Sequence, residues 1–252
     1  MKFKVIVITQ ARIGSTRFPR KVLKELNDDT LLGLHLDRLK KSKSLEKIVV
    51  ATTHEADSDI ICNIAKGKGV EFYKGSQNDV LDRFYKAALN YSPDYVVRVT
   101  SDCPLIDPAL VDEVINDTIT GNYDYGSNTL TEDFPDGQDI EVFKMSALKY
   151  AWENASKSSD REHVTPYIRE NCDLKGGKLF KGYDYKSPQN YNDIRMTVDV
   201  PEDLEVIKWL ISEIGSIASW QQYVKIMKEH PEKLINSNII RNEGYNISKL
   251  KD

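Results

Sequence analysis

The sequence predicts an α/β fold in three layers, with helices covering both faces of a mostly parallel β-sheet. Two observations predict it. Short β-branched runs alternate with helical stretches through the first half of the chain. A small cationic loop directly follows the first apolar strand, and single aspartates follow two later strands. Because ligands in open α/β sheets bind outside the carboxyl ends of the strands, these segments also predict where the site lies.

Strands and helices alternate regularly between residues 3 and 118. Each predicted strand is a short β-branched run, and each predicted helix carries apolar residues at helical spacing. The strand and helix pairs are 3–8 with 31–40, 47–51 with 57–66, 70–73 with 79–90, and 95–99 with 108–118. This alternation is typical of βαβ units, which place their strands in parallel.

The alternation ends near residue 120. Residues 121–138 are rich in Gly, Asn, Asp, Thr and Pro, which predicts a long excursion from the sheet. We then expect a strand at 139–143, helices at 146–157 and 161–171, a strand at 193–198 and a helix at 201–214. Pro201 suits the first turn of that last helix. We assign residues 1–215 to one domain and 216–252 to a C-terminal helix with a loosely packed polar tail.

Composition excludes several classes of protein. The chain has 252 residues and a formal net charge of −4, with basic residues spread among acidic ones, so we expect no nucleic acid partner. No apolar run approaches the roughly 20 residues that a transmembrane helix needs, and the N-terminus lacks a secretory signal pattern. We therefore expect a cytoplasmic protein without a membrane partner. The three cysteines are far apart and predict neither a disulfide framework nor a zinc site.

The loop after the first strand has the composition of a polyphosphate site. Gly14 and Ser15 allow a tight turn whose backbone N–H groups converge. Three cations can neutralise several phosphate oxygens, and they are Arg12, Arg17 and Lys21. The plain alternative is a solvated surface loop. The buried-type strand that precedes the loop favours the phosphate site.

The loop has neither the Walker spacing nor the dinucleotide-binding spacing. It resembles the signature loop of the cytidylyltransferases that activate acidic sugars, which include the acylneuraminate and 3-deoxy-octulosonate enzymes, and most closely their spore-coat polysaccharide (SpsF-like) branch. The matching residues are Gln10-Ala11-Arg12, Gly14-Ser15-Thr16-Arg17-Phe18-Pro19 and Lys21. The resemblance covers about residues 3–210 and implies a Rossmann-like nucleotidyltransferase. The nucleotide-binding residues that we assign are Gln10, Ala11, Arg12, Gly14, Ser15, Thr16, Arg17, Lys21, Asp82 and Arg83.

Two aspartates are the candidate ligands of a magnesium ion. Nucleotidyl transfer requires charge neutralisation on phosphates, and Mg²⁺ prefers one or two carboxylates together with phosphate oxygens and water. Asp102 and Asp199 each follow a β-branched strand. The resemblance assigns both to the metal through the segments Asp102-Cys103-Pro104-Leu105-Ile106 and Val198-Asp199-Val200-Pro201-Glu202-Asp203-Leu204. For Asp199, an ordinary helix cap is the alternative.

Further polar segments extend the predicted site. The resemblance places Asp82 and Arg83 beside the nucleotide, whereas the alternative is a simple helix start capped by Ser76 or Asn78. Residues 160–167 bring charged side chains and an imidazole to another helix start, where they could orient the acceptor or, for the imidazole, accept a proton. A helix-end hydrogen bond is the alternative role of that imidazole. The acceptor-binding residues that we assign are Asn128, Asp139, Glu141, Arg161 and His163.

We expect CTP and an acidic sugar to give a CMP-sugar and pyrophosphate, with residues 121–193 closing over the acceptor and forming a homodimer. The catalytic residues would be Arg12, Lys21, Asp102 and Asp199. Where the octulosonate enzymes have Ser-Gly-Thr, this chain has Asn78-Asp79-Val80, so the resemblance does not determine which sugar is the substrate. A sugar 1-phosphate enzyme using CTP or GTP and a non-catalytic nucleotide-binding module remain alternatives. A glycosyltransferase is disfavoured because Thr100-Ser101-Asp102 lacks an Asp-x-Asp pair.

Overall fold

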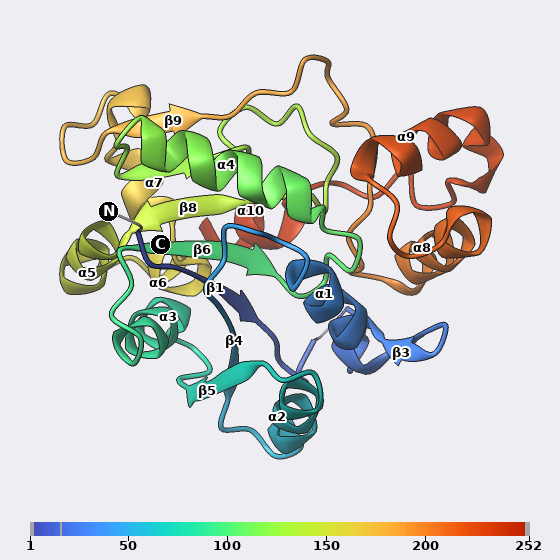
Figure 1. The fold of residues 1–252 in the computed structure, drawn as a ribbon, viewed down its shortest axis with the longest axis horizontal. Helices are drawn as coiled ribbons and strands as arrows, with labels where there is room; N and C mark the ends of the chain where they lie inside the picture. Colours follow the sequence, from blue (N-terminus) through green and yellow to red (C-terminus); the bar gives the residue numbers. More distant parts are fainter. Residues whose placement is uncertain (1–2, 16, 250–252) are drawn as a thin grey trace.

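The computed structural model describes residues 3–15 and 17–249, and a seven-stranded β-sheet forms its centre. The strands are β1 Val5–Gln10, β4 Lys47–Thr53, β5 Glu71–Gly75, β6 Tyr95–Thr100, β7 Tyr125–Ser127, β8 Glu141–Lys144 and β9 Gly182–Asp184. Their order is β5-β4-β1-β6-β8-β7-β9 (Figure 1). Neighbouring strands are parallel except that β8 runs antiparallel to both β6 and β7. A separate short hairpin joins β2 Glu25–Leu26 to β3 Asp29–Thr30.

Helices cover both faces of the sheet and confirm the predicted three layers. They are α1 Leu31–Leu39, α2 Ser58–Gly67, α3 Val80–Leu89, α4 Pro108–Thr120, α5 Met145–Asn154, α6 Ser158–His163, α7 Pro166–Glu170, α8 Pro201–Ile214, α9 Trp220–Glu229 and α10 Glu243–Lys249. Alternate residues of β1 point to opposite faces. Val5 and Val7 join the hydrophobic cluster that includes α4, whereas Ile6 and Ile8 join the cluster formed with α3 and α5.

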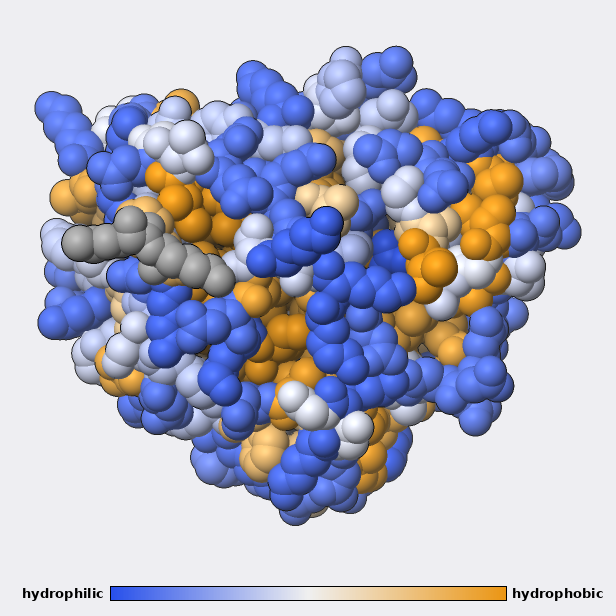
Figure 2. Space-filling model, viewed as in Figure 1, coloured by the Kyte–Doolittle hydropathy of each residue, from blue (hydrophilic) through white to orange (hydrophobic). Residues whose placement is uncertain are grey.

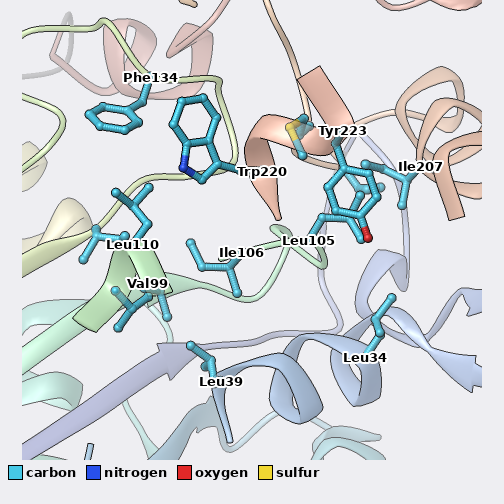
Figure 3. Close-up of a cluster of buried hydrophobic side chains, with 14 of the residues drawn as sticks. Leu34, Leu39, Val99, Leu105, Ile106, Leu110, Phe134, Ile207, Trp220 and Tyr223 are labelled. Carbon is cyan, nitrogen blue, oxygen red and sulfur yellow. The ribbon is translucent and has the colours of Figure 1, made fainter. Parts of the chain in front are cut away.

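The larger hydrophobic cluster extends from the sheet into α8 and α9, which stand together at one side of the molecule (Figure 1). Figure 3 shows the Trp220 indole beside the Phe134 ring, on the side of the cluster that carries Leu110 and Ile106. The two rings lie edge to face with centroids 5.5 Å apart. Tyr223, on the next turn of α9, is fully buried. Helix α9 therefore packs as part of the main core.

Two predicted elements differ in the structure. The predicted strand at 193–198 is extended but forms only an isolated bridge between Arg195 and Asp136, because its backbone pairs with two turns and not with a strand. Met196 N–H donates to the Asp136 carbonyl, and Val198 N–H donates to the Asp102 carbonyl. The predicted helix at 161–171 is divided into α6 and α7, since Pro166 starts a new helix.

The excursion contributes two strands that the sequence does not predict. Strands β7 and β9 each contain three residues, which is too short for a period of two to be recognised. They extend the sheet beyond β8. The strand predicted at 139–143 begins two residues later, at Glu141, so that Asp139 precedes β8.

The surface carries hydrophobic residues in separate patches among hydrophilic ones, on the face that Figure 2 shows. The most exposed large apolar side chains among the described residues include Ile217 and Ile240, at 72% and 70% exposure. Within residues 3–15 and 17–249, no helix is both long and apolar enough to cross a membrane.

Arg38 links α1 to two distant segments through buried hydrogen bonds. Its guanidinium donates to the carbonyl oxygens of Ile106, Ser216 and Ala218 at 2.6, 2.6 and 3.0 Å. The side chain therefore holds the turn before α4 and the connection between α8 and α9 against the first helix.

We predict that Arg38→Ala lowers the free energy of unfolding by about 3 kcal/mol, because two buried carbonyl groups and one partly buried carbonyl group lose their donor. Urea denaturation followed by circular dichroism measures the change. Lys225→Ala is the matched control, since that side chain is 75% exposed and lies 3.9 Å from Glu229. We expect the control to change stability by less than about 0.5 kcal/mol. An unchanged urea midpoint for Arg38→Ala would contradict this role.

Candidate active site

The carboxyl ends of two adjacent parallel strands bring the predicted phosphate loop and the first aspartate together. Gln10 at the end of β1 is paired with Thr100 at the end of β6. Lys21 lies in a short 3-10 turn after the loop, and its Nζ donates to Asp102 Oδ2 at 2.8 Å and to Asp199 Oδ1 at 2.7 Å. One ammonium group thus joins both candidate metal ligands.

Charges in this cluster stabilise one another. Burial alone would lower the pKa of the Lys21 ammonium, but Asp102 and Asp199 outweigh burial and raise it. Burial alone would raise the pKa of Asp102, and the adjacent Lys21 ammonium instead holds it well below its usual range. The lysine is therefore charged and Asp102 ionised at neutral pH.

Asp199 is available to the site because another residue caps α8. The Asp203 carboxylate accepts from the backbone N–H groups of Asp199 and Val200 at 2.8 and 3.2 Å, so the helix-cap alternative for Asp199 is wrong. The Asp199 carboxylate instead contacts Arg17 at 3.0 Å and Arg195 at 3.3 Å. This carboxylate therefore lies among three cations.

The buried His35 side chain forms a hydrogen bond with the turn that carries Asp102. The His35 Nδ1 lies 2.9 Å from the Cys103 carbonyl oxygen, and Nε2 lies 3.0 Å from Thr9 Oγ1. Burial lowers the pKa of His35 to about 4. The neutral tautomer that satisfies both contacts donates from Nδ1 and accepts at Nε2, as assigned from the hydrogen bonds. A single histidine in an apolar helix gave no sequence signal of this role.

The phosphate loop itself is open on one side. Arg12 is exposed, and Ala11 is buried with its N–H donating to the Ala51 carbonyl. Ser15 Oγ lies 3.4 Å from the Phe18 amide nitrogen, consistent with a tight turn. A Cβ on Gly14 would lie 2.9 Å from a carboxylate oxygen of Glu55. A side chain at residue 14 would therefore only displace the end of the flexible Glu55 side chain, and Thr16 lies outside the described residues.

The Arg83 side chain lies near Arg12 of the phosphate loop, but the Asp82 side chain points away from this loop. Arg83 is buried, and burial followed by the charge of Arg12 lowers its pKa to about 10, so the two guanidinium groups are close enough to interact. Asp82 turns toward α5, where its carboxylate accepts from Trp152 Nε1 at 2.9 Å. Asp79 caps α3 by accepting from the Asp82 N–H, so the expected cap at Ser76 or Asn78 is wrong.

A cavity of about 570 Å³ opens beside the lysine and aspartate cluster. Its walls come from the ends of β1 and β6, the excursion, α6 and α7, residues 195–199 and residues 240–245. The structure brings seven of the predicted site residues to this cavity. They are Gln10, Arg17, Asp102, Asp139, Glu141, His163 and Asp199.

Three predicted acceptor residues line the cavity with different electrostatic environments. Burial alone would raise the pKa of Glu141, but the Arg98 guanidinium outweighs it and lowers the pKa. Burial raises the pKa of Asp139 in spite of its ion pair with Arg241. Burial, followed by the charge of Arg98, lowers the pKa of His163 to about 4, so its imidazole is neutral at pH 7. The cavity thus offers an ionised Glu141, an Asp139 whose pKa is raised, and a neutral imidazole.

The structure does not bring Asn128 and Arg161 to the cavity. Asn128 is fully buried and braces the backbone, donating to the Gln138 carbonyl at 2.6 Å and accepting from the Ile140 N–H at 2.8 Å. Arg161 pairs with Asp79 at 2.7 Å and joins α6 to the start of α3. Both side chains are committed to local structure, and neither lines the cavity.

Sequence reasoning missed four arginines that line the cavity, namely Arg98, Arg169, Arg195 and Arg241. Arg98 interrupts the apolar run Val96-Val97-Arg98-Val99, and a cation in a central strand is a signal that could have found it. Arg195 similarly stands between Ile194 and Met196. Arg241 lies in a polar tail, where nothing in the sequence distinguishes it from a solvated arginine.

We predict that the buried His35 makes stability depend on pH. Its pKa is about 4 in the folded protein and near 6.5 in an unfolded chain, so the unfolded state binds more protons between these values. The stability that neutral, buried His35 provides is complete above pH 6.5 and is lost as the pH falls toward 4. His163 shifts in the same direction, whereas burial raises the pKa of Asp136 to about 7 and acts in the opposite direction, so we expect His35→Gln to reduce the loss of stability between pH 7.5 and 5.

Urea midpoints at pH 7.5 and 5 test this dependence. His54→Gln is the control, because that side chain is exposed, and it should leave the difference between the two pH values unchanged. The prediction fails if His35→Gln and the wild-type protein lose the same stability on acidification.

The comparisons with known proteins identify the family of this chain. The cytidylyltransferase family model matches residues 6–230. The spore coat polysaccharide biosynthesis protein SpsF of Bacillus subtilis is 31% identical over 237 residues, which cover 90% of this chain and 95% of SpsF. A 3-deoxy-manno-octulosonate cytidylyltransferase of Geobacter metallireducens is 33% identical over 112 residues, covering 44% of this chain and 43% of that protein.

A solved structure extends the likeness to the whole fold. The cytidylyltransferase from Leptospira borgpetersenii is 36% identical and superposes with a TM-score of 0.88, covering 95% of this chain and 100% of that one. The residues of the predicted loop and both aspartate segments lie within the range of the family match. The chain belongs to the cytidylyltransferase family and is a nucleotidyltransferase.

Proposed function

We propose that this enzyme transfers the cytidylyl group of CTP to an acidic sugar of the ulosonic acid type, giving a CMP-sugar and pyrophosphate for the synthesis of a surface polysaccharide or glycan. The observation that carries the proposal is an arginine-lined cavity directly beside the Asp102, Lys21 and Asp199 cluster. A sugar carboxylate gains more from guanidinium groups than a neutral sugar does. The names of SpsF and of the octulosonate enzyme support a sugar acceptor.

The reaction needs positioning and charge neutralisation more than covalent chemistry. A hydroxyl oxygen of the sugar attacks the α-phosphorus of CTP, the bond from that phosphorus to the bridging oxygen breaks, and pyrophosphate leaves. The hydroxyl proton passes to a base or to water. Arg12, Arg17 and Lys21 would bind the triphosphate, and the ammonium group of Lys21 has three donors with which to hold phosphate and carboxylate oxygens together.

The two aspartates fit a magnesium ion. Asp102 and Asp199 each place one carboxylate oxygen beside the Lys21 nitrogen, so both carboxylates would turn from this ammonium group to hold the ion. Hard oxygen donors suit Mg²⁺, and the described residues contain no group of three or more candidate ligand side chains, so phosphate oxygens and water would complete the octahedron. When bound, Mg²⁺ would neutralise charge on the α-phosphate and the leaving pyrophosphate.

The carboxylates and imidazole of the cavity suit the hydroxyl groups of a sugar. Asp139 and Glu141 can accept hydrogen bonds from sugar hydroxyls. The His163 Nε2 is buried without a hydrogen-bond partner in the described part of the chain, and its neutral ring can donate or accept there. These groups would orient the attacking hydroxyl, while the arginines hold the sugar's carboxylate.

A screen of the four common nucleoside triphosphates against a panel of sugars tests the proposal through pyrophosphate release with Mg²⁺. The panel holds N-acetylneuraminate, 3-deoxy-manno-octulosonate and several neutral sugar 1-phosphates. We expect turnover with CTP and an acidic sugar. Turnover with a sugar 1-phosphate alone, whether with CTP or GTP, would replace this proposal by the corresponding sugar 1-phosphate enzyme. No turnover with any pair would favour a nucleotide-binding module.

We predict that Asp102→Asn and Asp199→Asn each lower kcat at least about a hundredfold, because each removes a charged oxygen from the metal site. Neither should change the melting temperature by more than a few degrees, since Asp203 caps α8 in both. Asp59→Asn is the control, as its side chain is 83% exposed and remote from the cluster. Near wild-type turnover of either site variant at saturating Mg²⁺ would remove that residue from the site.

We further propose that the enzyme acts in the cytoplasm as a homodimer assembled through residues 121–193. Three large apolar side chains in this stretch, Tyr150, Leu174 and Leu179, are 40%, 51% and 46% exposed. Sedimentation velocity at micromolar protein should show a dimer, and the double variant Leu174→Glu, Leu179→Glu should dissociate it. A wild-type protein that sediments as an active monomer would contradict the dimer and leave the chemistry untouched.

A further inference from the structure

The polar tail packs across the acceptor cavity. We call residues 236–249 the C-terminal segment. It begins at Asn236, which is 2% exposed and donates from Nδ2 to Asp203 Oδ1 at 2.9 Å. It ends in α10, where Ser248 Oγ donates to the Glu162 carboxylate at 2.6 Å. The loosely packed tail expected from the sequence is therefore wrong for these residues, because buried polar contacts hold both ends of the segment.

Arg241 enters the cavity from this segment. Its Nη1 donates to the Phe134 carbonyl at 2.9 Å, and its Nη2 donates to Asp139 Oδ1 at 2.7 Å. The Nε is buried and has no hydrogen-bond partner among the described residues. A buried donor without a partner costs free energy, so its presence in a ligand cavity suggests an acceptor atom that arrives with the ligand.

Two other arginines of the cavity, Arg195 and Arg98, are more firmly committed to their carboxylate partners. Arg195 binds carboxylates through Nε, Nη1 and Nη2 together. Arg98 also has an unpartnered Nε, but it pairs with Glu141, whose side chain is only 5% exposed. Arg241 differs because Asp139, its carboxylate partner, is 31% exposed to the cavity. A ligand can therefore reach the edge of the Arg241 guanidinium beside Asp139.

Tyr245 forms a second contact between the segment and the acceptor residues. Its ring lies edge to face with His163, with centroids 5.0 Å apart, and the Arg169 guanidinium lies 5.1 Å from the ring centroid. Its hydroxyl oxygen accepts a hydrogen bond from Arg169 Nη2 at 2.6 Å. Tyr245 thus fixes the positions of the His163 and Arg169 side chains in the cavity.

We propose that the C-terminal segment completes the acceptor site, with Arg241 binding the carboxylate of the acidic sugar and Tyr245 positioning His163 and Arg169 around it. This inference rests on the proposed function and adds the residues that select the acceptor. The sugar's carboxylate would accept from Arg241 Nε, while Asp139 and Glu141 accept from hydroxyl groups. The segment also contacts the arginine that pairs with Asp199, since Glu243 lies 3.3 Å from Arg17.

The test measures steady-state kinetics of Arg241→Gln with whichever of 3-deoxy-manno-octulosonate and N-acetylneuraminate the wild-type enzyme turns over. We expect the KM for the sugar to rise about ten- to a hundredfold, as for loss of a charge-assisted hydrogen bond, and the KM for CTP to change less than about twofold. The same sugar with its carboxylate converted to the carboxamide gives the sharper readout. The wild-type enzyme should prefer the acid strongly, and Arg241→Gln should lose most of that preference.

Two further variants separate recognition from folding. Arg241→Lys keeps the charge without the planar fork and should recover part of the preference for the acid, even if the glutamine variant proves unstable. Lys233→Gln is the control, because Lys233 is exposed, lies just before the segment and does not line the cavity. It should leave both KM values unchanged.

The outcomes that would overturn the inference are distinct from those that test the proposed function. If the wild-type enzyme turns over an acidic sugar, and Arg241→Gln raises the KM of acid and carboxamide equally or affects CTP as much, Arg241 supports the structure and does not bind the carboxylate. An effect of Lys233→Gln equal to that of Arg241→Gln would have the same meaning. If no acidic sugar is turned over by the wild-type enzyme, the proposed function and this inference both fall.

Discussion

The rest of the site depends on one interaction, the sharing of the Lys21 ammonium between Asp102 and Asp199. The three residues are far apart in the chain, with separations of 81 and 178 residues from the lysine. Their contact joins the loop after β1, the turn after β6 and the start of α8. Two carboxylates so close together repel each other unless a cation lies between them. The Lys21 ammonium supplies that cation.

Buried polar groups hold these carboxylates in position before any substrate arrives. His35 supports the backbone beside Asp102, and Asp203 takes over the capping of α8 so that Asp199 remains available. Arg195 connects Asp203 to Asp199 and to the excursion at Asp136. Because these supporting side chains are themselves hydrogen-bonded, the carboxylates are already in position, and little free energy is needed to reorganise them during the reaction. Removal of a supporting residue would therefore affect chemistry and stability together.

The acceptor cavity is built from opposite charges that are paired with each other in the free enzyme. Glu141 holds Arg98, and Asp139 holds Arg241, so neither carboxylate nor guanidinium is left uncompensated. The proposed acidic sugar would exchange with these pairs or join them through its carboxylate. Selection of the acceptor would then depend on residues from the excursion and from the C-terminal segment, which are separated by about a hundred residues in the chain.

The sequence by itself determined the α/β class and the cytidylyltransferase family, because both depend on local patterns: β-branched runs, a Gly- and cation-bearing turn, and the segments around Asp102 and Asp199. Other features needed tertiary structure. The short strands β7 and β9 have no recognisable period. Residues 193–198 form backbone hydrogen bonds with the turns at Asp136 and Asp102, so they do not join the sheet as a strand. Arg161 looked like an acceptor ligand but pairs with Asp79, while Arg241 looked like part of a solvated tail and lines the cavity. A side chain's partner depends on which distant segment the folded chain brings beside it, and sequence spacing does not contain that information.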